Sequence, residues 1–146
     1  MQCTRAQSVL GNSRGTAAVE FALILLPLLL LIGGATDFGL AYFVSHIVQN
    51  AAREGARLAV TLQDLGANDS RVLPVVQSRI PDIGLFAAFK DGITNTGINC
   101  ASGKEEDKAV TVTVKGLYHY TFLRILPGFI NVSMDRAVKM RYEVCP

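Results

Sequence analysis

Hydrophobic residues dominate one long stretch near the start of the chain. Phe21–Thr36 is a run of 16 residues without a charged side chain. Extended back to Thr16, the segment has 21 residues; as a helix it would be about 32 Å long, enough to cross a hydrocarbon core of about 30 Å. One carboxylate, Glu20, lies at the head of this run. A carboxylate facing lipid is unfavourable by several kcal/mol, so Glu20 calls for a functional explanation.

Past this run the apolar pattern continues with helical spacing. Apolar or small residues follow one another in steps of three or four at Val44, Val48, Ala51, Gly55, Leu58 or Ala59, and Leu62. Gly66 and the polar residues after it supply a stop signal. We therefore expect one helix from about Thr16 to Leu65, kinked but not ended at Pro27, because bilayer helices tolerate proline.

The rest of the chain predicts a small α+β head with an antiparallel sheet. Ser70–Ile80 is typical of a short helix capped by the serine at its start. Asp91–Asp107 is polar and indicates a long loop. Apolar and polar residues alternate in Lys108–Leu123, where Gly116 indicates a bulge or a bend, and again in Asn131–Cys145, which predicts a closing strand.

These patterns divide the chain into four parts: a leader at 1–15, a transmembrane segment at 16–36, an extension of the same helix at 37–65, and a head at 66–146. Residues 1–15 hold two arginines and no acid, and beyond the apolar run no base occurs before Arg53. The positive-inside rule then places the N-terminus in the cytoplasm and the head outside. The remaining charge is balanced, so the chain lacks the basic face of a nucleic-acid-binding protein.

Candidate chemistry is sparse. His46 and His119 have no cysteine or carboxylate at ligand spacing, and neither a nucleophile elbow nor a phosphate-binding loop occurs. We therefore expect no enzyme activity, no metal and no cofactor. Without the leader, Cys100 and Cys145 remain, and an oxidising compartment would permit a disulfide worth about 3–4 kcal/mol; the alternative is two unpaired, buried thiols.

Small residues form a second pattern on the long helix. Ala51, Gly55 and Ala59 are spaced by four, as are Ala52 and Ala56. Such faces let helices approach one another closely. The partner is the chain's own head, a helix of a neighbouring subunit, or both on different faces of the helix.

Three interpretations compete for the apolar run. It is a secretory signal peptide cleaved after the small residues Gly33–Ala35, an uncleaved signal anchor, or a class III signal cut on the cytoplasmic side after Gly15. Glu20 favours the third, because an acid at the head of a signal peptide opposes the orienting positive charge. Cleavage after Gly15 would create an amine on Thr16, and Glu20 could neutralise it, or a neighbour's amine, in a low dielectric.

The residues also resemble a known family. The segments "RGTAAVEFALILLPLLL" and "DFGLAYFVSHIVQNAAREGARLAV" closely resemble TadE-like proteins, the minor pseudopilins of the Tad (tight adherence, Flp) pilus system. In that family a glycine, four further residues and Glu-Phe or Glu-Tyr precede a "QNAAREGAR" segment by about thirty residues. Here Gly15, Glu20, Phe21 and Gln49–Arg57 match this pattern. The resemblance is close over residues 14–60 and looser in the rest of the chain.

The resemblance implies that a membrane-embedded aspartyl prepilin peptidase cleaves between Gly15 and Thr16, and that Glu20 and Phe21 serve in recognition and subunit registration. It implies a single-pass protein of the bacterial inner membrane with a periplasmic head. Its partners would be a sibling pseudopilin, the major Flp pilin and the inner-membrane assembly platform. The protein would then prime or cap the fibre. The alternative is a signal-anchored periplasmic module that binds a ligand or an envelope partner, unrelated to pili.

Overall fold

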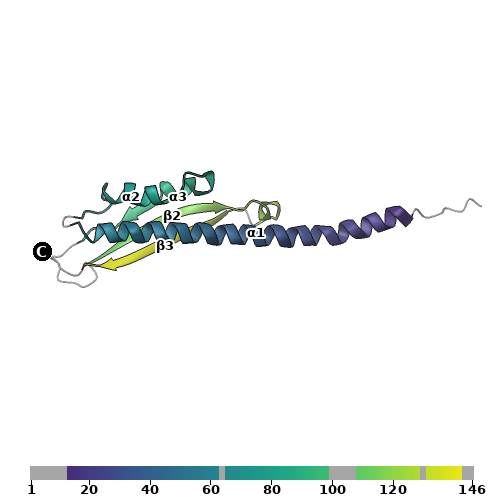
Figure 1. The fold of residues 1–146 in the computed structure, drawn as a ribbon, viewed down its shortest axis with the longest axis horizontal. Helices are drawn as coiled ribbons and strands as arrows, with labels where there is room; N and C mark the ends of the chain where they lie inside the picture. The colour runs from purple at the N-terminus through teal and green to yellow at the C-terminus, as the bar shows by residue number, and fades with distance from the viewer. Residues whose placement is uncertain (1–12, 63–64, 99–107, 129–130, 143–146) are drawn as a thin grey trace, which may run out of the picture.

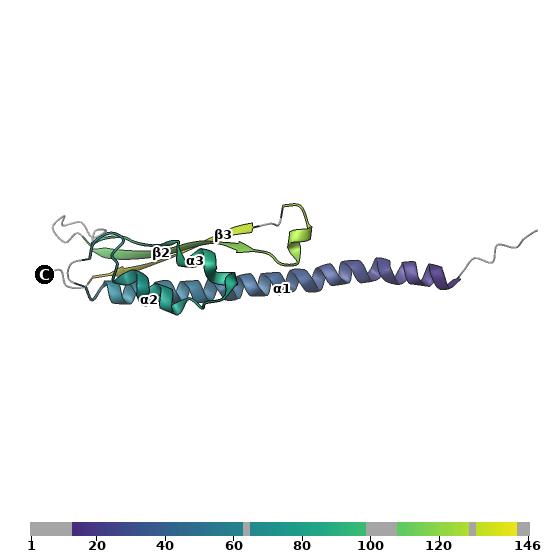
Figure 2. The ribbon, with the colours of Figure 1, turned by 90° about the horizontal axis from the view of Figure 1, so that it is seen from above.

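The computed structural model describes residues 13–62, 65–98, 108–128 and 131–142. The helix α1 (Ser13–Ala59) has 47 residues and runs along most of the molecule (Figure 1). The remaining elements, which we call the head, pack along its C-terminal half, and its N-terminal half stands free in both views (Figures 1 and 2). The expected α+β architecture, a long apolar helix followed by a small head with an antiparallel sheet, is confirmed.

The head contains the elements α2 (Val72–Arg79), η1 (Gly84–Phe86), α3 (Ala87–Lys90), β1 (Ile93–Asn95), β2 (Ala109–His119), η3 (Leu123–Ile125) and β3 (Asn131–Arg141). The strands form an antiparallel sheet in the order β1-β2-β3. The α-helices cover one face of this sheet, since α1 contacts β2 and β3 and α3 contacts β2. The other face remains open to solvent, as antiparallel sheets permit.

The central strand β2 shows why the sheet has two different faces. Its core-facing side chains, Val110, Val112, Val114 and Tyr118, are fully buried. The residues that point to the other face, from Thr111 to His119, are threonines, lysine, leucine and histidine, all partly or fully exposed. Because successive side chains of a strand point to opposite faces, the alternation seen in the sequence places one set of residues in the core. Each buried valine stabilises the fold by roughly 1.5–3 kcal/mol.

The helix α1 passes through Pro27, and Figure 1 shows its N-terminal part bending gently from the axis of the rest. It ends at Ala59, earlier than the expected Leu65. The reason lies in the last turn, where both the amide and the hydroxyl of Thr61 donate to the carbonyl of Leu58, at 2.9 and 2.7 Å. A side chain that competes for the helix carbonyls in this way favours an end. Leu65 is instead buried in the head.

The predicted cap of the second helix was wrong. The helix α2 starts at Val72, and Ser70 does not cap it; its first amide donates to the carbonyl of Asp69 at 3.2 Å. The carboxylate of Asp69 accepts from the amide and the guanidinium of Arg71, and these bonds hold the pKa of Asp69 well below its usual range. The helix ends as expected before Pro81, whose preceding residue is extended (φ −95°, ψ 118°).

Two further details of the sheet differ from expectation. Residues 91–107 were expected as a loop but contain β1, whose three residues are too few to show alternation. Gly116 marks neither a bulge nor a bend, because β2 continues through it and pairs it with Met134. It makes room for Phe89, since a Cβ at this position would lie 2.4 Å from the Phe89 ring.

Candidate functional site

The predicted processing site lies at the exposed start of α1. The structure begins the helix at Ser13, so the bond between Gly15 and Thr16 belongs to its first turn. Gly15 is exposed, and no atom lies within 4 Å of the position that a Cβ would take. Thr16 and Glu20 are also exposed. They are four residues apart and therefore lie on the same side of the helix, one turn from each other.

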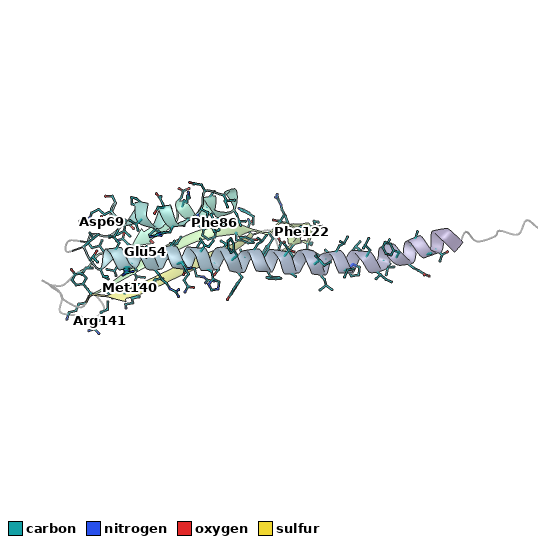
Figure 3. All side chains as sticks on the ribbon, viewed as in Figure 1. Glu54, Asp69, Phe86, Phe122, Met140 and Arg141 are labelled. Atoms are coloured by element: carbon teal, nitrogen blue, oxygen red, sulfur yellow. The ribbon has the colours of Figure 1, made fainter. Side chains whose placement is uncertain are left out.

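The half of α1 that follows presents apolar side chains in all directions. Its exposed large residues are Val19, Phe21, Leu23, Ile24, Leu26, Leu28, Leu29, Leu30, Leu31 and Ile32. Figure 3 shows side chains projecting on every side of this half, with no other element over most of it. Such a surface far exceeds the apolar patches of ordinary soluble monomers. The helix is long and apolar enough to cross a membrane.

Asp37 joins this apolar half to the head. Its carboxylate is fully buried and accepts three backbone N–H groups at the start of η3. Its Oδ1 accepts from Thr121 at 3.1 Å, and its Oδ2 accepts from Phe122 at 2.8 Å and Leu123 at 2.7 Å. These are amides that a helical turn leaves without internal acceptors, so Asp37 acts as a cap supplied by another element. The negative charge also makes each bond stronger than a neutral one.

Gly33, near Asp37, allows the segment around η3 to approach α1 closely, and Gly34 lies in ordinary contact range of the same segment. A Cβ on Gly33 would lie 2.9 Å from the Cβ of Phe122, and one on Gly34 would lie 3.7 Å from Leu123 Cδ2. Figure 3 shows Phe122 at the end of the head that faces the free half of α1. Gly33, one of the small residues that one sequence interpretation took for a signal-peptidase site, therefore has a packing role, whereas Ala35 is exposed.

Asp37 is a residue that the sequence analysis missed, noting only that bases are scarce after the apolar run. Its spacing carried the signal. Asp37, Ala41, Val44 and Val48 follow one another in steps of four and three, and all are buried. A carboxylate on the buried stripe of a helix must find hydrogen-bond donors elsewhere in the chain.

The small residues of the "QNAAREGAR" segment and the alanine just after it pack against the chain's own head. Ala51, Ala52, Gly55 and Ala56 of the segment and Ala59 beyond it are all buried there. A Cβ on Gly55 would lie 2.3 Å from Val76 Cγ2 of α2 and 3.5 Å from Val112 Cγ1 of β2. The structure shows the head as a partner of these small residues, and packing of another face of α1 on a neighbouring subunit stays a prediction.

The polar residues of the same segment lie on the outer side of α1. Arg53 donates to the Asn50 side chain at 3.3 Å, and Glu54 forms an ion pair with Arg79 of α2 at 3.3 Å (Figure 3). The ion pair is substantially exposed, with side-chain exposures of 40% for Glu54 and 61% for Arg79. Exposed pairs of this kind contribute at most about 1 kcal/mol.

Arg136 is a charged residue on the core-facing side of β3. Val138 and Met134 flank it on that side, and its Nε donates to Ser45 Oγ of α1 at 2.8 Å. The partly buried guanidinium thus has a partner, as buried polar groups require. It ties the edge strand to the long helix.

The described residues offer little for catalysis or metal binding. Among them, no group of three His, Cys, Asp or Glu side chains could hold a metal ion. The rings of His46 and Tyr42 pack edge to face with their centroids 4.3 Å apart, and His119 Nδ1 is hydrogen-bonded to Asn131. Cys100 and Cys145 lie outside the described residues, so their disulfide remains a prediction.

Comparison with known proteins bears on the long helix α1. The family model described as TadE-like protein matches residues 15–57. This match supports the resemblance read from the sequence, and its range includes Gly15, Glu20, Asp37 and most of the small residues that pack against the head. No curated protein and no solved structure gives a match.

Proposed function

We propose that this chain, which is TadE-like over residues 15–57, is a minor pseudopilin. In this role it is a structural component needed to assemble or initiate a Tad (Flp, type IVb) pilus used for adherence. It acts through its surfaces and not as an enzyme, in keeping with the structural character of the family. The chain contributes an apolar helix to the membrane and a folded head to the compartment outside.

One observation carries this proposal. A single helix is apolar and free in its first half and carries a compact head on its second half, and the family match spans both halves. The free half has no use in an aqueous monomer, because its large apolar side chains remain in contact with water. A lipid bilayer or a bundle of similar helices would remove these side chains from water.

The first step that we propose is removal of the leader, residues 1–15. A peptidase must unwind the helix around the bond that it cuts. The bond after Gly15 lies in the first turn of α1, where unwinding disrupts few helical hydrogen bonds. Glycine destabilises a helix by about 1 kcal/mol relative to alanine, which lowers the cost of this unwinding. The open space around Gly15 leaves access for a prepilin peptidase on the cytoplasmic side.

Glu20 then serves to register one subunit against the next. Cleavage creates an amine on Thr16, one helical turn from the Glu20 carboxylate. An unpaired charge in hydrocarbon is costly, so Glu20 favours the position in which an amine, its own or a neighbour's, lies beside it. Phe21 extends from the same exposed turn and takes part in recognition by the peptidase.

This function implies a location and a set of partners. The protein is a single-pass protein of the bacterial inner membrane, with a cytoplasmic N-terminus and a periplasmic head. It works with a sibling pseudopilin, the major Flp pilin and the assembly platform, and is either retained in the membrane or built into the fibre.

The decisive experiment is mass spectrometry of the mature N-terminus. A chain that starts at Thr16 supports the proposal. A start at Thr36 contradicts it and would also remove the two glycines on which Phe122 and Leu123 pack. A start at Met1 indicates a plain anchor.

Two variants separate the roles of the processing site. Gly15→Leu should block processing, whereas Gly39→Leu, at another glycine of α1 with open space around it, should leave processing intact. Glu20→Ala should be processed and yet assemble pili poorly. If pili form normally with Glu20→Ala and also when the head is altered, while head changes abolish binding of a ligand or envelope partner, the chain is instead a periplasmic binding module on a signal anchor.

A further inference from the structure

The segment between β2 and β3 exposes apolar side chains. We call residues 121–128, which include η3, the tip loop. Its Phe122, Ile125 and Leu126 are 50%, 81% and 37% exposed, while Leu123 is buried against α1. Side chains of this kind in a loop of a soluble domain would be unfavourable, so their surroundings need an explanation.

The tip loop lies where the apolar half of α1 meets the extension, because Asp37 binds its first three amides and the rest of the loop lies along the apolar half. Figure 2 shows it extending beyond the strands toward the free half of the helix. Together with α1 it forms an apolar groove of about 360 Å³, lined by Leu26, Leu29, Leu30, Gly34, Phe122, Leu123, Ile125 and Leu126. The loop therefore continues the apolar surface of the helix sideways.

The attachment of the tip loop to α1 fixes how far along the helix, and therefore how deep in a membrane that the helix crosses, the loop would lie. Asp37 holds the amides of Phe122 and Leu123, and Phe122 also packs on Gly33. Gly33 belongs to the last turn of the segment that is expected to cross the membrane, and Leu30 lies about 10 Å along the helix from Asp37. If this segment is in the bilayer, the loop must enter the outer leaflet with it.

The polar residues around the loop suit the headgroup level. Arg124 is exposed and borders a second hollow of about 440 Å³, which also includes His119 and Tyr120. Arginine and tyrosine are common where a chain meets lipid headgroups, because one end of each side chain is apolar and the other polar. The apolar side chains of the loop thus lie next to a cation that can meet lipid phosphates.

We propose that the tip loop inserts Phe122, Ile125 and Leu126 into the outer leaflet of the membrane that α1 crosses. The head then rests on the membrane at two points, the helix and the loop, with Asp37 fixing the distance between them. The inference rests on membrane insertion of α1, which is part of the proposed function, but not on a role in pili. Lipid is favoured over a protein partner because the groove is continuous with the lipid-facing side of the helix.

The chain contains no tryptophan, so a single introduced tryptophan reports its own surroundings. The full chain carrying Ile125→Trp is placed in vesicles of phosphatidylethanolamine and phosphatidylglycerol that contain phosphatidylcholine brominated either near the glycerol or near the chain end. Leu28→Trp, in the free half of α1, serves as the reference within the membrane. Ser70→Trp is the matched exposed control, next to Asp69 at the other end of the head (Figure 3). Ile125 is largely exposed, so its replacement should not disturb folding.

We expect the emission of Ile125→Trp to shift to the blue and to lose most of its intensity with lipid brominated near the glycerol, and less with lipid brominated near the chain end. Leu28→Trp should be quenched as well, and Ser70→Trp should not. If Ile125→Trp emits in the red and is not quenched while Leu28→Trp is quenched, the inference about the tip loop is overturned, but membrane insertion of α1 is still supported. Blue emission without quenching also overturns it, because protein then covers the loop. If Leu28→Trp itself is unquenched, the anchor and the inference fail together.

Discussion

Replacing Asp37 by alanine removes the carboxylate that holds the start of η3 against α1. Three backbone N–H groups lose their acceptor, and among these bonds the one from Leu123 is buried whereas those from Thr121 and Phe122 are partly buried. A buried donor left without a partner destabilises the structure by about 1–3 kcal/mol. For a donor that can bind water instead, the loss is the net contribution of its hydrogen bond, about 0.5–1.5 kcal/mol. We therefore expect Asp37→Ala to weaken the docking of the tip loop by about 3 kcal/mol.

Asparagine at the same position provides a graded second variant. Its amide oxygen can take the place of Oδ2 and keep the bonds from Phe122 and Leu123. Its NH₂ group then faces the amide of Thr121, which is on an exposed residue and can turn to water. The loss is one hydrogen bond and the charge that strengthened the other two, about 1.5 kcal/mol.

Hydrogen exchange of the full chain in detergent micelles measures these losses, because local opening of the loop exposes its amides. A change of 1.4 kcal/mol is tenfold, so exchange at Phe122 and Leu123 should accelerate about 100-fold in Asp37→Ala and about tenfold in Asp37→Asn. Glu54→Ala, which removes only an exposed ion pair, is the control and should leave these amides unchanged. Equal protection of the two amides in Asp37→Ala and the unmodified chain would refute the role assigned to Asp37.

Three further changes test the packing of the head by urea unfolding in micelles. Gly55→Ala should destabilise the head, because its Cβ would overlap α2 and overpacking costs about 1–3 kcal/mol, more than the helix gains from alanine. Gly39→Ala is the control, because a Cβ there meets open space; it should be neutral or stabilise the helix by up to about 1 kcal/mol. Arg136→Ala should cost about 1 kcal/mol through loss of its bond to Ser45, and an unchanged midpoint would show that this bond contributes nothing. Burial raises the pKa of Tyr118 above the unfolded value of about 10, so its contribution is complete below about pH 10 and declines as the pH rises through the folded pKa; Tyr118→Phe should lack this alkaline decline.

The features that the sequence predicted well depend on short-range patterns. The steps of three and four along α1 and the alternation along β2 and β3 report which side of each element is buried, and the elements formed accordingly. The predictions that failed depend on local competition or on short length. Thr61 ended α1 through its own hydrogen bonds, Asp69 displaced Ser70 at the start of α2, and β1 was too short to be seen.

By itself, the sequence determined the long apolar helix, the carboxylate Glu20 at its head and the similarity of residues 15–57 to TadE-like proteins. These depend on residues that follow one another along a single continuous helix. Only the tertiary structure decided what Asp37, Gly33 and Gly34 do, because the amides that Asp37 holds are 84 to 86 positions away along the chain. The helical spacing places Asp37 on the buried side of α1, but no local pattern tells which amides it binds. Its physical cause, the need of a buried carboxylate for donors, becomes visible when the two segments lie side by side.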